Sequence, residues 1–398
     1  MSTETNQEQI RAALRALPIE LPSWGFANAG TRFGAFPEPG VARDIYEKIE
    51  DAATVHRLTG VCPTVAVHIP WDLPPVGKTW ADIADFAKSE GVAIGAINPN
   101  LFQDHAYKLG SVCNPDAKIR KKAVAHLEEC AEIMKVTGSK LLSIWLADGT
   151  NYPGQDDIKS RRQRLIDSLA EGYAAMPSDG EMLVEYKLFE PAFYHTDLAD
   201  WGTSYTVCQK LGERAKVLVD TGHHGHYTNI EFIVATLISE GRLGGFHFND
   251  RRYADDDLIV GSANPYALFC IFHELINGND GKTAFQTAYM LDQSHTVEKK
   301  IEAMVLSVLN VQTAYAKALL VDRAALAGLQ VAGDVMGAHA ILRDAYETDV
   351  RPILAATREE IGRPADPLKA LATDEIVKER RARRQVEPAR ASGAGLGA

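Results

Sequence analysis

The chain alternates between short apolar runs and longer stretches in which apolar residues recur three and four positions apart. The short runs predict β-strands, and the longer stretches predict amphipathic helices. Eight strands are predicted, at residues 21–28, 63–70, 92–98, 140–147, 182–189, 216–221, 242–249 and 288–293. The clearest helices are predicted at residues 41–58, 117–137, 158–175, 203–211 and 228–240. Thr228 and Glu231 have the spacing of a capping box, which predicts a helix start at Thr228.

Eight strands, each followed by a helix-sized crossover, favour an α/β protein with a closed parallel (β/α)8 TIM barrel over an open doubly wound sheet. No G-x-G-x-x-G motif follows a predicted strand, so the signal of a dinucleotide-binding fold is missing. We expect the barrel at residues 1–296 and a helical extension at 297–380 that packs on the barrel or on a neighbouring subunit. A basic, glycine-rich tail at 381–398 is expected to be disordered.

Composition narrows the class of partner. The 398 residues are 46% hydrophobic and carry a net charge of −11, which argues against nucleic acid or an anionic membrane as the main partner. The five cysteines are far apart and form no C-x-x-C pair, so we expect reduced thiols. The N-terminal residues lack a signal-peptide pattern, and no apolar run approaches 18 residues, which predicts a cytoplasmic protein without a membrane span.

Polar residues gather where four consecutive predicted strands end. In a TIM barrel the catalytic residues lie at the carboxyl ends of the strands, so this position is where an active site is expected. The residues are Glu185 and Lys187 on the fifth strand, Asp220 and His223 at the sixth, His247 on the seventh, Asp255 and Asp257 after it, and Asp292 on the eighth. Singly, each acid more often caps a helix or pairs with Arg, and an acidic run is more often a solvated loop. Their coincidence at four neighbouring strand ends favours one shared site.

Five carboxylates and two imidazoles cannot share one barrel mouth without cations, because like charges a few ångström apart raise each other's pKa. The sequence therefore predicts bound metal. Oxygen ligands with an imidazole and no thiolate suit Mn²⁺, Mg²⁺ or Co²⁺. Because these ligands are too many for one small ion with open positions, two divalent cations are predicted, and Mn²⁺ is the first choice.

The order of these residues resembles the xylose-isomerase-like sugar isomerases. The Asp-x-x-His at 220–223, followed by His247 on the next strand, is most similar to the L-rhamnose isomerases of the bacterial type that also accept other aldoses. The resemblance covers roughly residues 20–300. It implies that Glu185, Asp220, His247 and Asp292 hold a first metal. It also implies that His223, Asp255 and Asp257 hold a second one, with Asp220 as the bridge.

The resemblance also implies roles around the substrate. Lys187 would lie beside the O1 end of the sugar and polarise the carbonyl, although a salt bridge to Glu185 is the structural alternative. His68 would contact the sugar and Trp145 would stack on it, but a core role for each is equally open. His223 is also expected near the substrate. Phe33 or Phe36 is the candidate for an aromatic that a neighbouring subunit lends to the pocket, and a homotetramer is expected by analogy.

The expected reaction interconverts L-rhamnose and L-rhamnulose, and also D-allose and D-psicose, by a metal-assisted 1,2-hydride shift. In this hypothesis the cations polarise O1 and O2, and Asp257 acts with a metal-bound water to move the hydroxyl proton. A ketose 3-epimerase is the first alternative, which the D-x-D at 255–257 and Asp292 in place of Glu disfavour. A metal-dependent endonuclease on the same barrel is disfavoured by the acidic charge. A non-catalytic sugar-binding protein is the third alternative.

Overall fold

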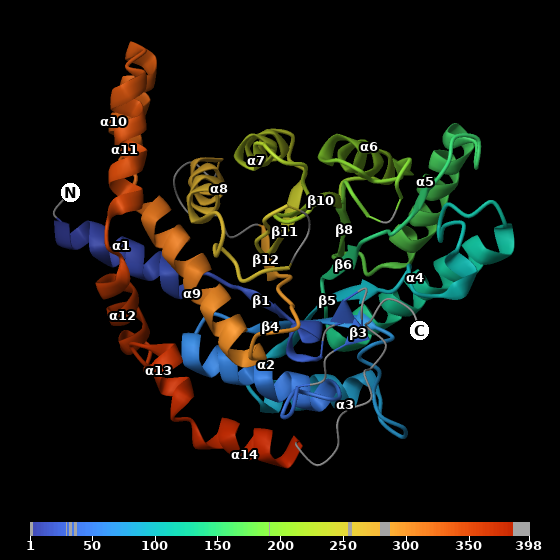
Figure 1. The fold of residues 1–398 in the computed structure, drawn as a ribbon, viewed down its shortest axis with the longest axis horizontal. Helices are drawn as coiled ribbons and strands as arrows, with labels where there is room; N and C mark the ends of the chain where they lie inside the picture. The colour runs from blue at the N-terminus through green and yellow to red at the C-terminus, as the bar shows by residue number, and fades with distance from the viewer. Residues whose placement is uncertain are drawn as a thin grey trace.

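Eight parallel strands close into a barrel in the computed structural model of the chain (Figure 1). The structure describes residues 3–28, 30–31, 34–35, 38–190, 192–253, 257–278 and 287–384. The barrel strands, in spatial order, are β1 (Glu20–Pro22), β12 (Ala288–Leu291), β11 (Leu243–Phe248), β10 (Ala215–Asp220), β8 (Glu181–Glu185), β6 (Leu141–Ile144), β5 (Ala93–Pro99) and β4 (Thr64–Ile69). Each overlaps a predicted strand, and the predicted TIM barrel is confirmed.

The helices that separate the barrel strands form the outer ring. They are α2 (Ile45–Thr59), α3 (Trp80–Ser89), α4 (Ala117–Thr137), α5 (Ile158–Ala175), α6 (Trp201–Leu211), α7 (Ile230–Ser239) and α8 (Pro265–Gly278). Side chains between this ring and the sheet form the main apolar core. A second, small cluster of buried side chains comes from barrel strands, and it consists of Ala66, Ala96, Leu183, Leu218 and Met290. These residues fill the barrel, which is therefore a packed core with its chemistry at one end.

The first barrel strand is shorter than predicted. After β1 the chain enters the 3-10 helix η1 (Ser23–Phe26) instead of continuing as a strand to residue 28. Pro22 has no N–H to donate to a sheet ladder. At Gly25 a Cβ atom would lie 2.2 Å from Met304 Cε and 2.9 Å from the Gln293 carbonyl oxygen. Glycine thus allows η1 to pack tightly against α9 (Lys300–Leu319) and the segment after β12, a contact that periodicity alone does not reveal.

The helix after β10 begins one residue later than the predicted capping box. Asn229 is the N-cap of α7, and its side chain accepts a hydrogen bond from the Phe232 N–H at 2.7 Å. Thr228 belongs to the preceding turn, where its hydroxyl donates to the Gly225 carbonyl at 2.8 Å. The prediction of a capping box from Thr228 is therefore wrong, because Asn229 takes the capping position.

The ring is completed by α9 (Lys300–Leu319), which contacts both α8 and α2. The barrel thus continues beyond the expected boundary at 296. The remaining helices are α1 (Thr3–Arg15), α10 (Arg323–Ala332), α11 (Val335–Glu347), α12 (Arg351–Glu360), α13 (Pro367–Ala372) and α14 (Glu375–Arg383). Figure 1 shows α10 and α11 projecting away from the barrel. Among the described residues no single helix is long and apolar enough to cross a membrane, although α9 and α10, bent by 61°, pass the same test as a pair.

The C-terminal helix is anchored to the barrel ring by charge. The buried Arg384 guanidinium lies 2.7 Å from Asp51 Oδ2 and 3.0 Å from Glu50 Oε2, both on α2. The described structure thus continues past residue 381, where the tail was expected to begin, and residues 385–398 lie outside the described residues.

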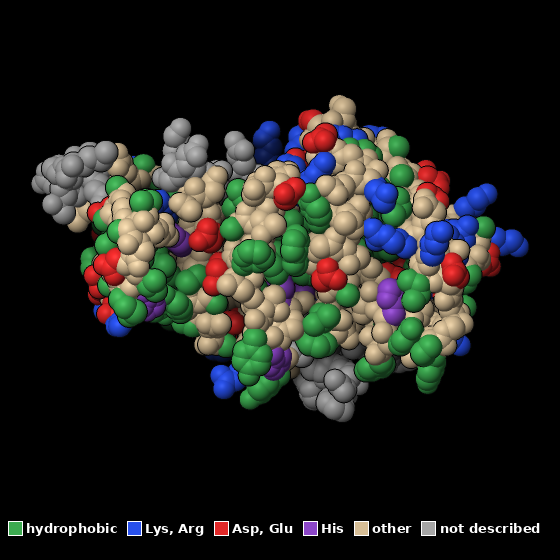
Figure 2. Space-filling model, turned by 90° about the horizontal axis from the view of Figure 1, so that it is seen from above, with side chains coloured by type: hydrophobic (Ala, Val, Ile, Leu, Met, Phe, Trp, Pro, Cys, Tyr) green, Lys and Arg blue, Asp and Glu red, His purple; other side chains and the backbone are tan. Residues whose placement is uncertain are grey.

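The acid excess is not spread evenly over the surface. Figure 2 shows acidic and basic side chains on one face, with Lys and Arg gathered at the end where Figure 1 places α4 and α5. Both helices begin with basic sequences, AKIRKK in α4 and IKSRR in α5. The net charge of −11 therefore does not describe every face of the molecule.

Candidate metal centre

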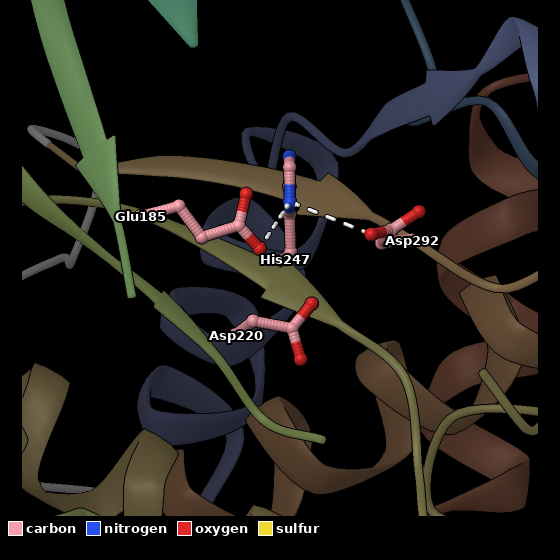
Figure 3. Close-up of side chains that lie close together, drawn as sticks. All are labelled: Glu185, Asp220, His247 and Asp292. Carbon is pink, nitrogen blue, oxygen red and sulfur yellow. Dashed lines mark hydrogen bonds and ion pairs between the residues drawn. The ribbon is translucent and has the colours of Figure 1, made fainter. Parts of the chain in front are cut away.

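Four side chains from neighbouring strands converge at the carboxyl end of the barrel (Figure 3). Glu185 and Asp220 are the last residues of β8 and β10, His247 is the penultimate residue of β11, and Asp292 directly follows β12. One ligand atom from each lies within 4.8 Å of the others. The barrel register explains the convergence, because Asp220 pairs with His247 and Leu218 pairs with Glu185 across adjacent strands.

Nδ1 of His247 lies at the centre of this cluster. It is 3.3 Å from Glu185 Oε1 and 3.6 Å from Asp292 Oδ2. Neighbouring ligands of an ion with bonds of about 2.1 Å are about 3 Å apart. The four side chains, three carboxylates and one imidazole, thus have the chemistry and nearly the spacing to hold a small divalent cation.

The acids and imidazoles of the cluster shift one another's pKa values. Burial disfavours the ionised form of Glu185, but the imidazoles of His247 and His223 outweigh it and lower the pKa of Glu185 to about 2. Burial likewise disfavours the imidazolium of His247, but Glu185, Asp292 and Asp220 outweigh it and raise the pKa of His247 to about 9. In the metal-free protein the His247 proton therefore offsets part of the negative charge, and a divalent cation would replace that proton.

Two of the residues predicted for a second cation, His223 and Asp257, are described by the structure. Nδ1 of His223 is 3.1 Å from Glu185 Oε1, and its Nε2 is 3.9 Å from Asp220 Oδ2. Asp257 is linked to Asp220 through Asn249, whose amide lies 3.1 Å from both Asp220 oxygens and 3.5 Å from Asp257 Oδ1. Asp255 lies outside the described residues. His223 thus contacts the first group directly, whereas Asp257 is connected to it through the side chain of Asn249.

Lys187 points to an acid other than the one considered from sequence. Its Nζ lies 2.6 Å from Glu190 Oε2 and 5.0 Å from the centre of the Trp145 ring. Lys187 is buried, so its charge is held close to the end of β8. Trp145 in turn contacts Phe102 edge to face at 4.7 Å. Lys187 and Trp145 therefore lie together just beyond the ends of β8 and β6, with an ammonium group over an aromatic face.

His68 is buried at the end of β4 and stacks on Trp71, with ring centres 3.8 Å apart. Burial, with a smaller contribution from the charge of Lys48, lowers the pKa of His68 to about 3, so its imidazole is neutral at pH 7. Among the described residues, neither His68 Nδ1 nor the buried Trp145 Nε1 has a hydrogen-bond partner. Buried polar atoms without partners are uncommon, and a hydroxyl-rich ligand could supply them. The candidates Phe33 and Phe36 lie outside the described residues.

Two residues near the cluster were missed from sequence. Asn249 orients the Asp220 carboxylate, and its position two residues after His247 places it on the same side of the extended chain, which is a signal that could have identified it. Trp24 donates from Nε1 to Asp292 Oδ1 at 2.7 Å. These two residues are 268 positions apart in sequence, so only the closed barrel brings them together.

A second group of potential ligands lies in loops on the same face of the barrel. Cys113 Sγ is 3.1 Å from Asp148 Oδ2 and 3.3 Å from Asp197 Oδ2. Asp197 is already paired with the buried Arg161, whose Nε lies 2.9 and 2.8 Å from its two oxygens. Asp148 accepts hydrogen bonds from the N–H and hydroxyl of Ser111. This group is therefore a hydrogen-bonded network in which the guanidinium of Arg161 supplies the positive charge.

Comparison with known proteins agrees with the barrel fold. Residues 60–281, more than half of the chain, match the family described as "Xylose isomerase-like TIM barrel". The chain belongs to this family. It is 46% identical over 367 residues to a probable sugar isomerase of Mesorhizobium japonicum, a match that spans 91% of this chain and 84% of that protein.

More distant relatives bear on the choice of substrate. An L-rhamnose isomerase of Salmonella paratyphi B is 24% identical over 381 residues and matches 85% of each chain. Among solved structures, that of an L-ribulose 3-epimerase superposes with a TM-score of 0.56 at 13% identity, covering 77% of this chain and 98% of that one. At 13% identity, the similarity to the L-ribulose 3-epimerase structure shows a shared fold and nothing more. A sugar isomerase related to xylose isomerase is thus supported, whereas the L-rhamnose specificity expected from sequence is not carried by such distant identity.

Proposed function

We propose that the chain is a metal-dependent aldose–ketose isomerase. The observation that carries the proposal is the convergence of Glu185, Asp220, His247 and Asp292 at the carboxyl end of the barrel. The relative with 46% identity, named a probable sugar isomerase, supports the same class of reaction. These four residues would hold one divalent cation. A second would involve His223, Asp255 and Asp257, with Asp220 as the shared ligand, and Mn²⁺ is the first cation to test in both positions.

Chemistry at the site divides between the cation and the protein. The cation would act as a Lewis acid that polarises two adjacent sugar oxygens. The Lys187 ammonium, held by Glu190 2.6 Å away, would stabilise negative charge developing at the O1 end. His68 is neutral because burial lowers the pKa of its imidazole, so it would bind a sugar oxygen without adding a positive charge near the cation. Asp257 would orient the water that carries the proton from O2 to O1 of the sugar.

The substrate is proposed as a monosaccharide, and L-rhamnose with L-rhamnulose is the first pair to test, followed by D-allose with D-psicose. Purified protein loaded with Mn²⁺ should convert at least one aldose of a panel of 6-deoxy and unmodified hexoses into its ketose, as separated by chromatography. EDTA should abolish the conversion and Mn²⁺ should restore it. Ketohexoses belong in the same panel, because a ketose 3-epimerase acts on ketoses and leaves aldoses unchanged. A product that differs from the supplied ketose only at C3 would instead identify a 3-epimerase, and aldoses and ketoses that both stay unchanged after long incubation would reject both enzymes.

The hydride-shift hypothesis has its own isotope test. Moving hydrogen from C2 to C1 as a hydride keeps the label of a C2-deuterated aldose in the ketose product. An enediol intermediate formed by a protein base would exchange that label with solvent. We expect retention, and wash-out at the rate of turnover would require a base at C2 in place of the hydride shift.

A further inference from the structure

Asp292 is the least enclosed of the four clustered residues. Its side chain is 20% exposed, compared with 0% for Asp220 and 3% for Glu185. It directly follows β12, and its backbone N–H donates to the Phe248 carbonyl at 2.9 Å, so the backbone is held while the side chain is partly exposed. A carboxylate in this position can rotate more readily than one enclosed by the sheet, so its orientation depends on specific contacts.

The two oxygens of Asp292 face different partners. Oδ1 accepts a hydrogen bond from the Trp24 indole N–H at 2.7 Å, whereas Oδ2 lies 3.6 Å from His247 Nδ1 at the centre of the cluster. An indole N–H can donate but cannot accept, so it selects a carboxylate oxygen and fixes the direction of the other one. The Trp24 ring also meets the ring of His247 edge to face, with centres 6.5 Å apart.

The segment that carries Trp24 is hydrogen-bonded to a buried ion pair, Lys48 with Asp72. The hydroxyl of its neighbour Ser23 donates to Asp72 Oδ2. Asp72 is buried, lies 2.5 Å from the Lys48 ammonium on α2, and accepts a hydrogen bond from the backbone N–H of His68 at 2.7 Å. One carboxylate thus joins η1, the end of β4 and helix α2. Because the charge of Asp72 is compensated in a buried place, this junction is costly to rearrange.

We propose that Trp24 is a positioning residue that orients Asp292 toward the cation, and that the Lys48–Asp72 pair holds Trp24 in place through Ser23. The inference rests on the proposed function, since it concerns the cation of that site. Partners that orient a metal ligand without touching the metal commonly change metal affinity about 10- to 100-fold when they are removed. Loss of the indole N–H is therefore expected to lower the affinity for the cation more than it lowers the stability of the fold.

The decisive variant is Trp24→Phe, which keeps an aromatic ring and removes the donor. EDTA-treated protein is titrated with Mn²⁺, and free Mn²⁺ is followed by electron paramagnetic resonance. We expect the dissociation constant of the variant to rise about 10- to 100-fold and turnover to recover at high Mn²⁺. Trp71→Phe is the matched control, because the Trp71 N–H donates to Gln103 Oε1 at 2.8 Å and should leave Mn²⁺ affinity unchanged.

A milder variant covers the case in which Trp24→Phe does not fold. Ser23→Ala removes the hydrogen bond to Asp72 and leaves the indole present, so Mn²⁺ affinity should also fall, by a smaller factor than in Trp24→Phe. Wild-type Mn²⁺ affinity in a folded Trp24→Phe protein would overturn the proposal, as would an equal loss in Trp71→Phe. If the unmodified chain binds Mn²⁺ and isomerises a sugar, such a result rejects the positioning role alone. Failure of the unmodified chain to do either rejects the proposed function.

Discussion

Two buried groups on the same face of the barrel each bring potential metal ligands within 4.8 Å of one another, yet they differ in how their charge is compensated. In the network of Cys113, Asp148 and Asp197, the guanidinium of Arg161 lies against Asp197. In the cluster around His247, two carboxylates face the same imidazole nitrogen. Proximity of ligands therefore does not distinguish a metal centre from a structural network, whereas charge compensation does.

The largest expected effect comes from one substitution made in both groups. Asp220→Asn should abolish tight Mn²⁺ binding and lower turnover about a thousandfold or more, because several kcal/mol of charge stabilisation depend on the cation. Asp148→Asn should leave Mn²⁺ affinity within about twofold, since this carboxylate belongs to the network. Mn²⁺ titration and an isomerase assay measure both. Equal loss of Mn²⁺ in the two variants would erase the distinction between the groups.

The next effect concerns stability without metal. Arg161→Met leaves Asp197 buried without its cation and should lower the free energy of unfolding by about 3–5 kcal/mol. Asp292→Asn removes one of several mutually repelling carboxylates, so in EDTA it should change that free energy by less than about 1 kcal/mol. Urea unfolding of both variants tests the contrast. An Arg161→Met protein as stable as the wild type would show that the network does not depend on this ion pair.

The pH dependence of the free energy of unfolding should contain a contribution from Asp148 of the network. Burial, reinforced by the charge of nearby Asp197, outweighs the hydrogen bonds and raises the pKa of Asp148 to about 6. A raised carboxyl pKa stabilises the fold fully below its unfolded value, near 4, and this contribution is lost as pH rises through about 6. The loss amounts to about 3 kcal/mol. Asp148→Asn should remove this slope from urea unfolding between pH 4 and 7, and an unchanged slope would assign it to other groups.

The smallest effect is expected at the thiol. Burial, together with Asp148 and Asp197, raises the pKa of Cys113 well above its usual value, so the group is a neutral hydrogen-bond donor and a poor metal ligand at pH 7. Cys113→Ser should retain the wild-type Mn²⁺ stoichiometry and turnover within about twofold. Elemental analysis of the purified variant checks this. A loss of bound metal in this variant alone would make the network a second metal site.

Comparison of the two groups also shows what could be predicted from the sequence. The clustered residues follow apolar strands directly, so the geometry of a parallel barrel requires Glu185 and Asp220 to lie at one rim. The network was not predicted, because Cys113 and Asp197 lie in irregular loops whose paths are set by tertiary contacts. Trp24 was missed for a related reason, since η1 replaces the predicted end of the first strand.

Above all, we propose that the cluster around His247 holds a divalent cation. Anomalous diffraction from crystals soaked in Mn²⁺ tests it directly, because it locates the ion without assuming an activity. We expect a Mn²⁺ peak among Glu185, Asp220, His247 and Asp292 and none beside Cys113. A peak in the network of Cys113, Asp148 and Asp197, with none at the four clustered residues, would contradict it.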